Sequence, residues 1–222
     1  MKFLIFDAGP IISLTMNGLL PVLEKLKKEF NGRFIITPHV RKEVIDKPMK
    51  IGKYKFEAVL VKDLLDRKVL SLSSEIIGNN QLDSETKKIM DNVNSIFKSA
   101  EGNINLIQEG EASCLAFSNL CNCDNVIAVD ERSVRMLVEA PENLKGLLEK
   151  KLHTSVSVNN TALKKIKNFK FIRSAELMYV AYKKDLFGIK KTKELLDAVL
   201  YAVKFKGAAI SSREIEEMKR LV

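Results

Sequence analysis

The sequence predicts an α/β fold, a three-layer α/β/α sandwich in which a mainly parallel central sheet lies between two layers of helices. The chain has 222 residues, of which 46% are hydrophobic, so it is long enough to bury a full core. Short apolar runs alternate with segments of helical periodicity, as in chains that build parallel sheets. Two of these runs, at residues 3–6 and 125–129, end in an aspartate, and such runs are typical of strands buried on both faces.

The first quarter of the chain contains two expected strands and the helices that follow them. The run at 3–6 is the first strand, and the Ala-Gly-Pro sequence at 8–10 forms its turn. Apolar residues three and four apart predict a helix over 11–28, with a break at Asn17 and Gly18 and a second start at Pro21. Residues 33–36 are the next strand, after which Thr37 and Pro38 are expected to begin a helix as N-cap and first residue.

The middle of the chain is expected to be mainly helical. An amphipathic helix is expected over residues 51–70, followed by a short strand at 70–73. The side chains expected to form its buried stripe are Phe56, Val59, Leu60, Leu64 and Leu65. From residue 74 to 105 the composition becomes polar, and one helix is expected over 83–99, with Gly102 as its stop.

The second half continues the alternation of strands and helices. The run at 125–129 is an expected strand, and residues 169–173 form another. Helices are expected at 110–121, 132–138, 141–153, 177–181, 195–203 and 212–221. Ser212 is expected to cap the last of these, and residues 155–160 show no clear pattern.

Charge and cysteine content restrict the partners and the compartment. Lysine and arginine number 37 against 28 acidic residues, which gives a formal charge of +9 and favours polyanions such as nucleic acid, although lysine-rich solvated helix faces also explain such a balance. Cys114, Cys121 and Cys123 fit neither a disulfide framework nor a four-ligand zinc site, which favours the reducing cytoplasm. No apolar run approaches the roughly 20 residues of a membrane span, and we expect no membrane partner.

Four carboxylates occupy comparable positions relative to the expected strands and helices. Asp7 and Asp130 each end a strand, while Glu43 and Glu111 lie early in helices, beside the apolar face. Because ligands bind open α/β sheets at the carboxyl ends of the strands, we expect these acids to converge there. Converging acids raise one another's pKa, so such a cluster usually holds a divalent cation. Taken alone, Asp7 is better explained as a helix N-cap.

Four short segments containing these acids follow one another with a recognisable spacing. They are residues 6–14 (FDAGPIISL), 40–44 (VRKEV), 110–112 (GEA) and 128–132 (AVDER). In order and spacing they resemble the PIN-domain nucleases, and the segments at 175–178 and 206–211 look like the closing helices of longer archaeal and bacterial PIN proteins. The resemblance implies one PIN-like domain over 1–222 with a negatively charged pocket. Residues 47–108 would be a helical insertion, and 174–222 a C-terminal helical extension packed on the core.

The resemblance also implies an activity, that of a divalent-metal-dependent endoribonuclease. Asp7, Glu43, Glu111 and Asp130 would bind Mg²⁺ or Mn²⁺, and water would hydrolyse RNA phosphodiester bonds. Where the family often has a hydroxyl or amide two residues after its first aspartate, this chain has Gly9. The candidates for auxiliary polar groups are Ser13, Thr37 and Glu131, for the last of which a solvated helix start is an equal explanation.

Basic residues next to the acids in sequence are candidates for contacts with substrate phosphates. They are Arg41, Lys42, Arg132 and Arg135, and solvated positions on helices explain each of them equally well. His39 and His153 are expected at the surface or at helix caps, and the cysteines in packing roles.

Other functions are compatible with the same residues. The acids of a PIN-like module that only binds RNA or assembles with other proteins would no longer hold metal. Many PIN nucleases are toxins with an antitoxin protein as partner, and the additional length of this chain offers surfaces for a homodimer or for substrate selection. Nucleotide binding at the first turn is disfavoured because residues 8–10 lack the glycine pattern that cradles phosphates.

Overall fold

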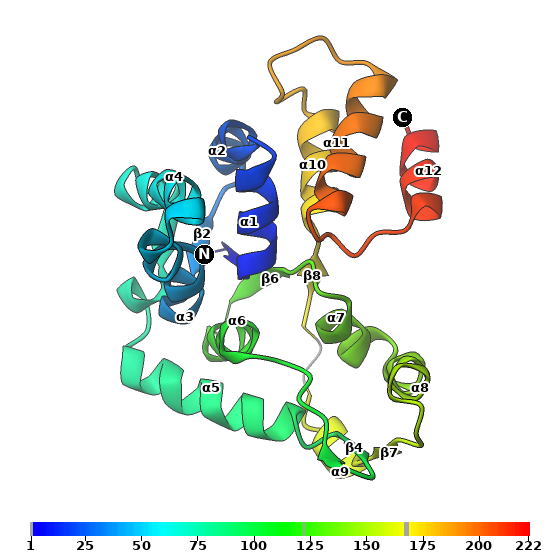
Figure 1. Ribbon diagram of the computed structural model, residues 1–222. Coiled ribbons are helices and arrows are strands. Elements are labelled where there is room, and N and C mark those ends of the chain that lie inside the picture. Colours follow the sequence, from blue (N-terminus) through cyan, green and yellow to red (C-terminus); the bar gives the residue numbers. More distant parts are fainter. Residues whose placement is uncertain (1, 122, 167–168) are drawn as a thin grey trace.

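The computed structural model describes residues 2–121, 123–166 and 169–222 and shows an α/β fold with an all-parallel central sheet (Figure 1). Its strands, in spatial order, are β3 (Leu70–Leu72), β2 (Arg33–Ile36), β1 (Lys2–Phe6), β6 (Asp124–Ala128) and β8 (Phe171–Ile172). The β1 strand lies in the middle, where Ile5 pairs with Ile35 on one side and with Ile127 on the other. The prediction of a mainly parallel sheet is therefore confirmed.

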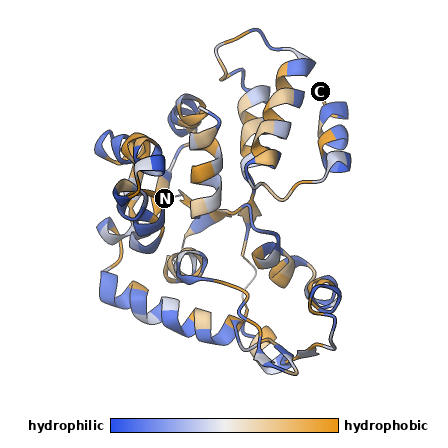
Figure 2. Ribbon diagram, viewed as in Figure 1, coloured by the Kyte–Doolittle hydropathy of each residue, from blue (hydrophilic) through white to orange (hydrophobic). Residues whose placement is uncertain are grey.

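Helices cover both faces of this sheet and make the three layers of a sandwich. On one face lie α1 (Ala8–Met16), α2 (Leu20–Glu29), α10 (Ser174–Lys183) and α11 (Lys193–Phe205), with α12 (Ser212–Arg220) packed on α11 (Figure 1). On the other lies α6 (Glu109–Leu120), and α5 (Asn79–Val93) packs against its outer side. Beyond β6 the chain continues into α7 (Arg132–Glu139) and α8 (Pro141–Leu152). Figure 2 shows that α1 and α11 are largely hydrophobic and α12 mainly hydrophilic.

The region 47–108, expected to be a helical insertion, also contains strands. Its helical parts are η2 (Pro48–Lys50), η3 (Gly52–Tyr54), α4 (Lys55–Asp66), η4 (Ser73–Glu75) and α5. Its β3 strand is the edge of the central sheet, because Leu70 and Leu72 pair with β2. Two more strands, β4 (Phe97–Ser99) and β5 (Gly102–Asn103), join β7 (Ser157–Val158) in a small antiparallel sheet, beside which lies α9 (Asn160–Leu163).

Two predictions for this region are wrong in detail. In α4 the buried residues are Ala58, Val61 and Leu64, whereas Phe56 is 70% exposed and Val59 46% exposed. All four residues of the run 58–61 are apolar, so the sequence is compatible with either of two buried faces on this helix. Packing against α1 and the helical segments after β2 buries the face that was not predicted. The helix predicted at 83–99 spans 79–93, because the buried Phe97 pairs with β7 instead of continuing the helix.

Helix boundaries elsewhere follow capping chemistry. Thr37 caps α3 (Pro38–Arg41) as predicted, since its Oγ1 accepts a hydrogen bond from the Val40 N–H over 3.2 Å. One π-helical turn, η1 (Lys42–Asp46), continues α3. The cap of α12 is Ser211 instead of Ser212. His153 ends α8 with a left-handed backbone, at φ 51°.

Buried hydrophobic side chains from the sheet, from α6 and from the three C-terminal helices form one continuous cluster. The segment 174–222 therefore packs on the same core as the sheet, through contacts such as the Asn17 Nδ2 bond to the Ala202 carbonyl over 3.2 Å. All three cysteines are free thiols, and Cys114 is buried. Within the described residues, no helix is both long enough and apolar enough to span a bilayer.

Candidate active site

A cleft of about 1400 Å³ lies at the carboxyl ends of β1 and β6 and collects the acids singled out in the sequence. Asp7, Glu43, Glu111 and Asp130 all line it, and Glu131 lies beside them. The α5 helix, the segment between β5 and α6, and the end of α8 supply the other walls. Four segments far apart in the sequence thus bring carboxylates to one place.

Asp7 is both a helix cap and a member of this cluster. It follows β1, is only 7% exposed, and its carboxylate accepts a hydrogen bond from the Gly9 N–H over 3.5 Å. Its pKa is raised to about 6, mainly by burial and to a smaller extent by the charges of Glu43 and Asp130, while the backbone hydrogen bonds oppose the rise. Asp7 therefore serves as an N-cap and still faces the cleft.

Asp130 is held rigidly by the start of α10. Its Oδ1 accepts a hydrogen bond from the Ser174 N–H and its Oδ2 one from the Ser174 hydroxyl, both over 2.8 Å. Burial raises the pKa of this carboxyl, which is 2% exposed, while the two Ser174 bonds act in the opposite direction. The register of β1 and β6, in which Phe6 pairs with Ala128, places Asp130 close to Asp7 in the same edge.

Glu43 lies in the π-helical turn, a feature that often marks functional sites. Its carboxylate rests against the first turn of α6 at Gly110, where an added Cβ would stand 2.8 Å from Glu43 Oε1. Burial raises the pKa of Glu43, and Lys47 and the Gly110 N–H oppose that rise. A larger residue at position 110 would therefore displace the end of the Glu43 side chain from this place.

Glu111, in the first turn of α6, has a strongly raised pKa. It occupies the third position of α6, where its Oε2 accepts a hydrogen bond from the Gln108 N–H over 2.9 Å as part of a capping box. Its pKa is raised to about 8, mainly by burial and to a smaller extent by the charges of Asp7, Glu131 and Glu43, while the hydrogen bond from the Gln108 N–H opposes the rise. The carboxylates of the cleft are therefore close enough to repel one another electrostatically.

The donor set fits a hard divalent cation in its chemistry, because it consists of carboxylate oxygens in a buried, mutually repelling group. Within the described residues, however, no three histidine, cysteine, aspartate or glutamate side chains are placed so that they could hold one ion. Asp7, Asp130 and Glu111 instead accept hydrogen bonds from the chain. To share an ion, these carboxylates would have to come closer together than they are in this structure.

The remaining sequence candidates lie outside the lining of the cleft. Ser13 and Thr37 are fully buried, and Thr37 is hydrogen-bonded to Ser113, with 2.6 Å between the hydroxyl oxygens. Arg41 pairs with Asp46, and Arg135 pairs with Glu139, each over 3.5 Å.

Lys42 and Arg132 are exposed. His39 lies near Asp83 and Glu109 on the surface, 3.1 Å from Asp83 Oδ1. Lys42, Arg132 and His39 are not among the described residues that line the cleft.

Several residues of the site were not identified from the sequence, among them two lysines and one serine. Lys47 and Lys151 line the cleft, and Ser174 holds Asp130. Lys47 stands four residues after Glu43, and this spacing placed it on the Glu43 side of a helix. For Lys151 and Ser174 the sequence carried no such signal, because their proximity depends on how α8 and α10 pack.

Gly9 is part of the cleft wall. A Cβ at this position would lie 3.6 Å from the Cβ of Asp130 and 3.8 Å from Asp7 Oδ2, which are ordinary van der Waals distances. Packing against these atoms therefore does not require glycine at the position where PIN nucleases often have a polar side chain.

Comparisons with protein-family models, with curated proteins and with solved structures found no match to this chain. The resemblance to PIN nucleases therefore rests on the sequence motifs alone.

Proposed function

We propose that this protein is a divalent-metal-dependent endoribonuclease that uses the acidic cleft to hydrolyse RNA. The observation that supports it most is the convergence of Asp7, Glu43, Glu111 and Asp130 on one cleft at the carboxyl ends of parallel strands. The raised pKa values of Asp7 and Glu111 add to this support, since perturbed carboxylates in a cleft are typical of catalytic sites.

In this proposal the acidic residues would bind the metal ion, and lysine residues would bind the RNA phosphates. Asp7 and Asp130 provide two fixed carboxylates, because one caps α1 and the other is held by Ser174. Glu43 and Glu111 have longer side chains and would complete the ligand set from η1 and from the first turn of α6. Bound Mg²⁺ or Mn²⁺ would supply a polarised phosphoryl oxygen and an activated water. Lys47 and Lys151 on the wall of the cleft would bind the phosphates of the strand on either side.

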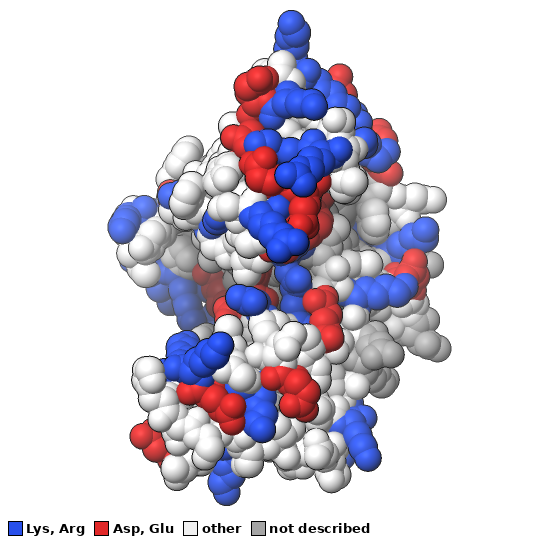
Figure 3. Space-filling model, turned by 90° about the vertical axis from the view of Figure 1, so that its right-hand side faces the viewer, with Lys and Arg blue, Asp and Glu red and all other residues white. Residues whose placement is uncertain are grey.

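RNA is the proposed substrate because of the resemblance to PIN nucleases and the formal charge of +9. Figure 3 shows acidic side chains set back in a recess on one side of the molecule, with lysine and arginine side chains around it. Such an arrangement would attract a polyanion to the rim and leave the acids free for metal.

The decisive test is cleavage of a defined single-stranded RNA in manganese by Asp7→Asn and Glu111→Gln. Each amide keeps the shape of the side chain and removes the charge, so we expect activity to fall by at least about 100-fold. Glu142→Gln, which alters an exposed glutamate on α8, is the matched control and should cut at the parental rate. Retention of full activity by folded Asp7→Asn and Glu111→Gln would refute the proposal.

A second candidate is a module that binds RNA without cutting it. It is favoured by the absence, among the described side chains, of three acids already placed around one ion. In that case the RNA would bind without cleavage in any divalent metal, and Glu111→Gln would bind it as tightly as the parent or more tightly.

A further inference from the structure

A run of consecutive exposed residues, 50–56, spans the end of η2, all of η3 and the start of α4. Three of its side chains are large and apolar, since Ile51 is 48% exposed, Tyr54 39% and Phe56 70%. In Figure 1 the α4 helix lies at the outer edge of the molecule. Because burying such side chains is favourable, a run that leaves three of them in solvent is a candidate surface for a partner.

The same part of the chain is strongly basic. Residues 47–56 contain four lysines and no acidic residue. All four lysines are exposed: Lys47, Lys50, Lys53 and Lys55. In the described part of the chain, the neighbouring ion pairs are formed by Arg41 and Arg67 and by none of these lysines. Their positive charges are therefore available to an anionic partner.

Segment 47–56 begins at the wall of the acidic cleft. Lys47 lines the cleft together with Glu43, and the chain continues from it directly into η2. The η2 turn packs on both η1 and η3, and all three pack against α4. The seven residue steps from Lys47 to Tyr54 span at most about 25 Å. One extended strand in the cleft could therefore also contact this segment.

The combination of exposed rings and cations indicates the kind of partner. The Lys53 ammonium lies 5.1 Å from the centre of the Tyr54 ring, so a cation and a ring are presented together. Proteins that bind single-stranded nucleic acid pair such cations with phosphates and stack unpaired bases on the rings. Duplex RNA offers no unstacked base, and a second copy of the chain would bring the same lysines against these across a two-fold interface.

An anionic membrane would also attract lysines and apolar side chains. A flat bilayer, however, does not follow a surface that continues into a cleft, whereas a flexible strand does. The continuity of segment 47–56 with the cleft wall at Lys47 therefore favours RNA.

We propose that segment 47–56 is a second contact surface for single-stranded RNA, next to the acidic cleft. Its exposed lysines bind phosphates, and Tyr54 and Phe56 stack on unpaired bases. One strand then runs from the cleft past Lys47 onto the start of α4. This inference rests on the proposed function for the identity of the strand, and it adds that the preferred substrate is single-stranded.

The first test is the affinity of the full-length protein for a labelled single-stranded RNA dodecamer, measured by fluorescence anisotropy in the presence of chelator. Phe56→Leu keeps an apolar side chain but removes the ring, so binding should weaken about tenfold. Phe56→Tyr keeps the ring and should bind nearly as tightly as the parent. The same dodecamer annealed to its complement should bind parent and Phe56→Leu equally. Melting temperatures of all variants separate loss of binding from loss of folding.

The second test is the salt dependence of the same binding. The double variant Lys53→Gln/Lys55→Gln removes two phosphate contacts. The logarithm of its association constant should therefore fall less steeply with the logarithm of salt concentration, by about 1.4, or about 0.7 for each contact with a single strand. Lys190→Gln/Lys193→Gln is the matched control, since it makes the same change of charge at exposed lysines by the start of α11 and should leave the slope unchanged.

Cleavage of the dodecamer in manganese separates this inference from the proposed function. Phe56→Leu should raise KM more than it lowers kcat, whereas Asp7→Asn should lose kcat. A parent protein that binds RNA through Phe56 but cuts none would refute the nuclease and support the contact surface. Unchanged RNA affinity in both Phe56→Leu and the Lys53/Lys55 variant would overturn the inference even if the parent cuts RNA. So would sedimentation with phosphatidylserine vesicles that needs Phe56 when RNA affinity does not.

Discussion

At the scale of single residues, the acidic cleft is built from carboxylates that each have a structural partner as well as a place in the site. Asp7 accepts from the Gly9 N–H, Asp130 from Ser174, and Glu111 from the Gln108 N–H. These bonds oppose the rise in pKa that burial causes but do not cancel it. The acids are thus positioned in the folded chain at the expense of its stability at neutral pH.

This cost predicts a pH dependence of stability in the metal-free protein. Glu111, with a pKa of about 8 when folded and near 4.5 when unfolded, binds its proton more tightly in the folded state, and Asp7, at about 6 against 3.8, does the same. The free energy of unfolding should therefore decrease as pH rises from about 5 to about 8.5, by up to about 1.4 kcal/mol for each unit of difference.

Urea unfolding at both pH values in the presence of chelator measures this decrease. Glu111→Gln has no such proton to lose, so its stability should depend less on pH, and it should be more stable than the parent at about pH 8.5. Glu214 does not interfere, because its pKa of about 2 places its own effect at lower pH. Identical pH profiles for parent and variant would contradict this assignment of the pKa.

At the scale of elements, the sequence predicted the strands and helices that are marked by a pattern within their own residues. The strand at residues 3–6 and the helix start at Thr37 could be predicted because an apolar run and a capping pair each carry their own signal. The buried side of α4 could not, since Ala58, Val59, Leu60 and Val61 are all apolar and only the neighbouring elements decide between them. The β4 strand was predicted as the end of a helix and β7 was not assigned, because both strands are too short to show a period.

The junction of α10 and α12 depends on Arg173, which is 8% exposed. It donates to the Ala209 carbonyl and to Glu214 Oε1, both over 2.8 Å, and also pairs with Glu176. Arg173→Ala would leave these groups without a partner. We expect a loss of about 2–4 kcal/mol in urea unfolding, less than for a fully buried pair because both glutamates are partly exposed.

Arg213→Ala is the matched control for this prediction. Arg213 also pairs with a glutamate, Glu217 over 3.0 Å, but its side chain is 89% exposed, so no measurable change is expected. Equal stability of the two variants would show that the Arg173 network does not hold the C-terminal helices. Because Ser174 follows Arg173 and binds Asp130, loss of the network should also lower any activity that needs Asp130.

At the scale of the whole molecule, the order of elements predicted the parallel sheet and brought the four acids to one edge of it. The sequence could not predict the opposite wall of the cleft. Lys151 arrives there from α8, and its position depends on packing between segments that are far apart in the chain. The sequence also could not predict which basic residues face the cleft. Arg41 and Arg135 are close to the acids in sequence, yet they pair with Asp46 and Glu139 and do not line the cleft.

Metal binding should be visible in the stability of the whole molecule. Manganese that binds only the folded state at 100 times its dissociation constant raises the free energy of unfolding by about 2.7 kcal/mol. We therefore expect a higher melting temperature in manganese, reversed by chelator, and a smaller increase in Asp7→Asn. An unchanged melting temperature for the parent would favour the module that binds RNA without metal.

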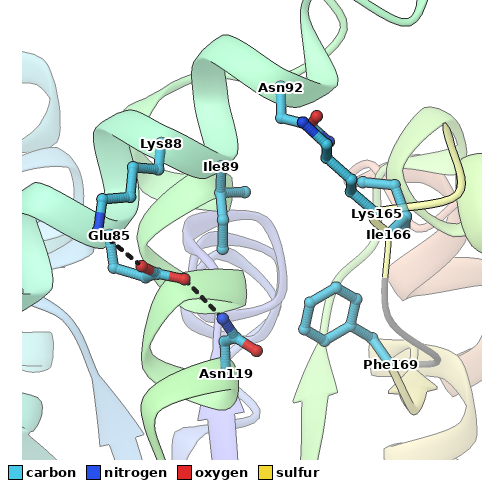
Figure 4. A pocket seen from close by; sticks show the side chains of 8 residues that line it. All are labelled: Glu85, Lys88, Ile89, Asn92, Asn119, Lys165, Ile166 and Phe169. Atoms are coloured by element: carbon cyan, nitrogen blue, oxygen red, sulfur yellow. Dashed lines mark hydrogen bonds and ion pairs between the residues drawn. The ribbon is translucent and has the colours of Figure 1, made fainter. Parts of the chain in front are cut away.

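The α5 helix takes part in the acidic cleft and in a second, smaller cavity of about 290 Å³, which Asn119 and Phe169 also line (Figure 4). Met90, Asp91 and Asn94, at its end, face the acidic cleft, whereas Glu85 and Ile89 line the second cavity. It also packs along α6, whose first turn carries Glu111 and whose last turn carries Asn119. The two cavities therefore share α5 as a wall, and a ligand in one cavity that moved α5 would change the affinity of the other cavity for its own ligand. Because coupling between binding sites is reciprocal, the second ligand would change the affinity for the first by the same factor.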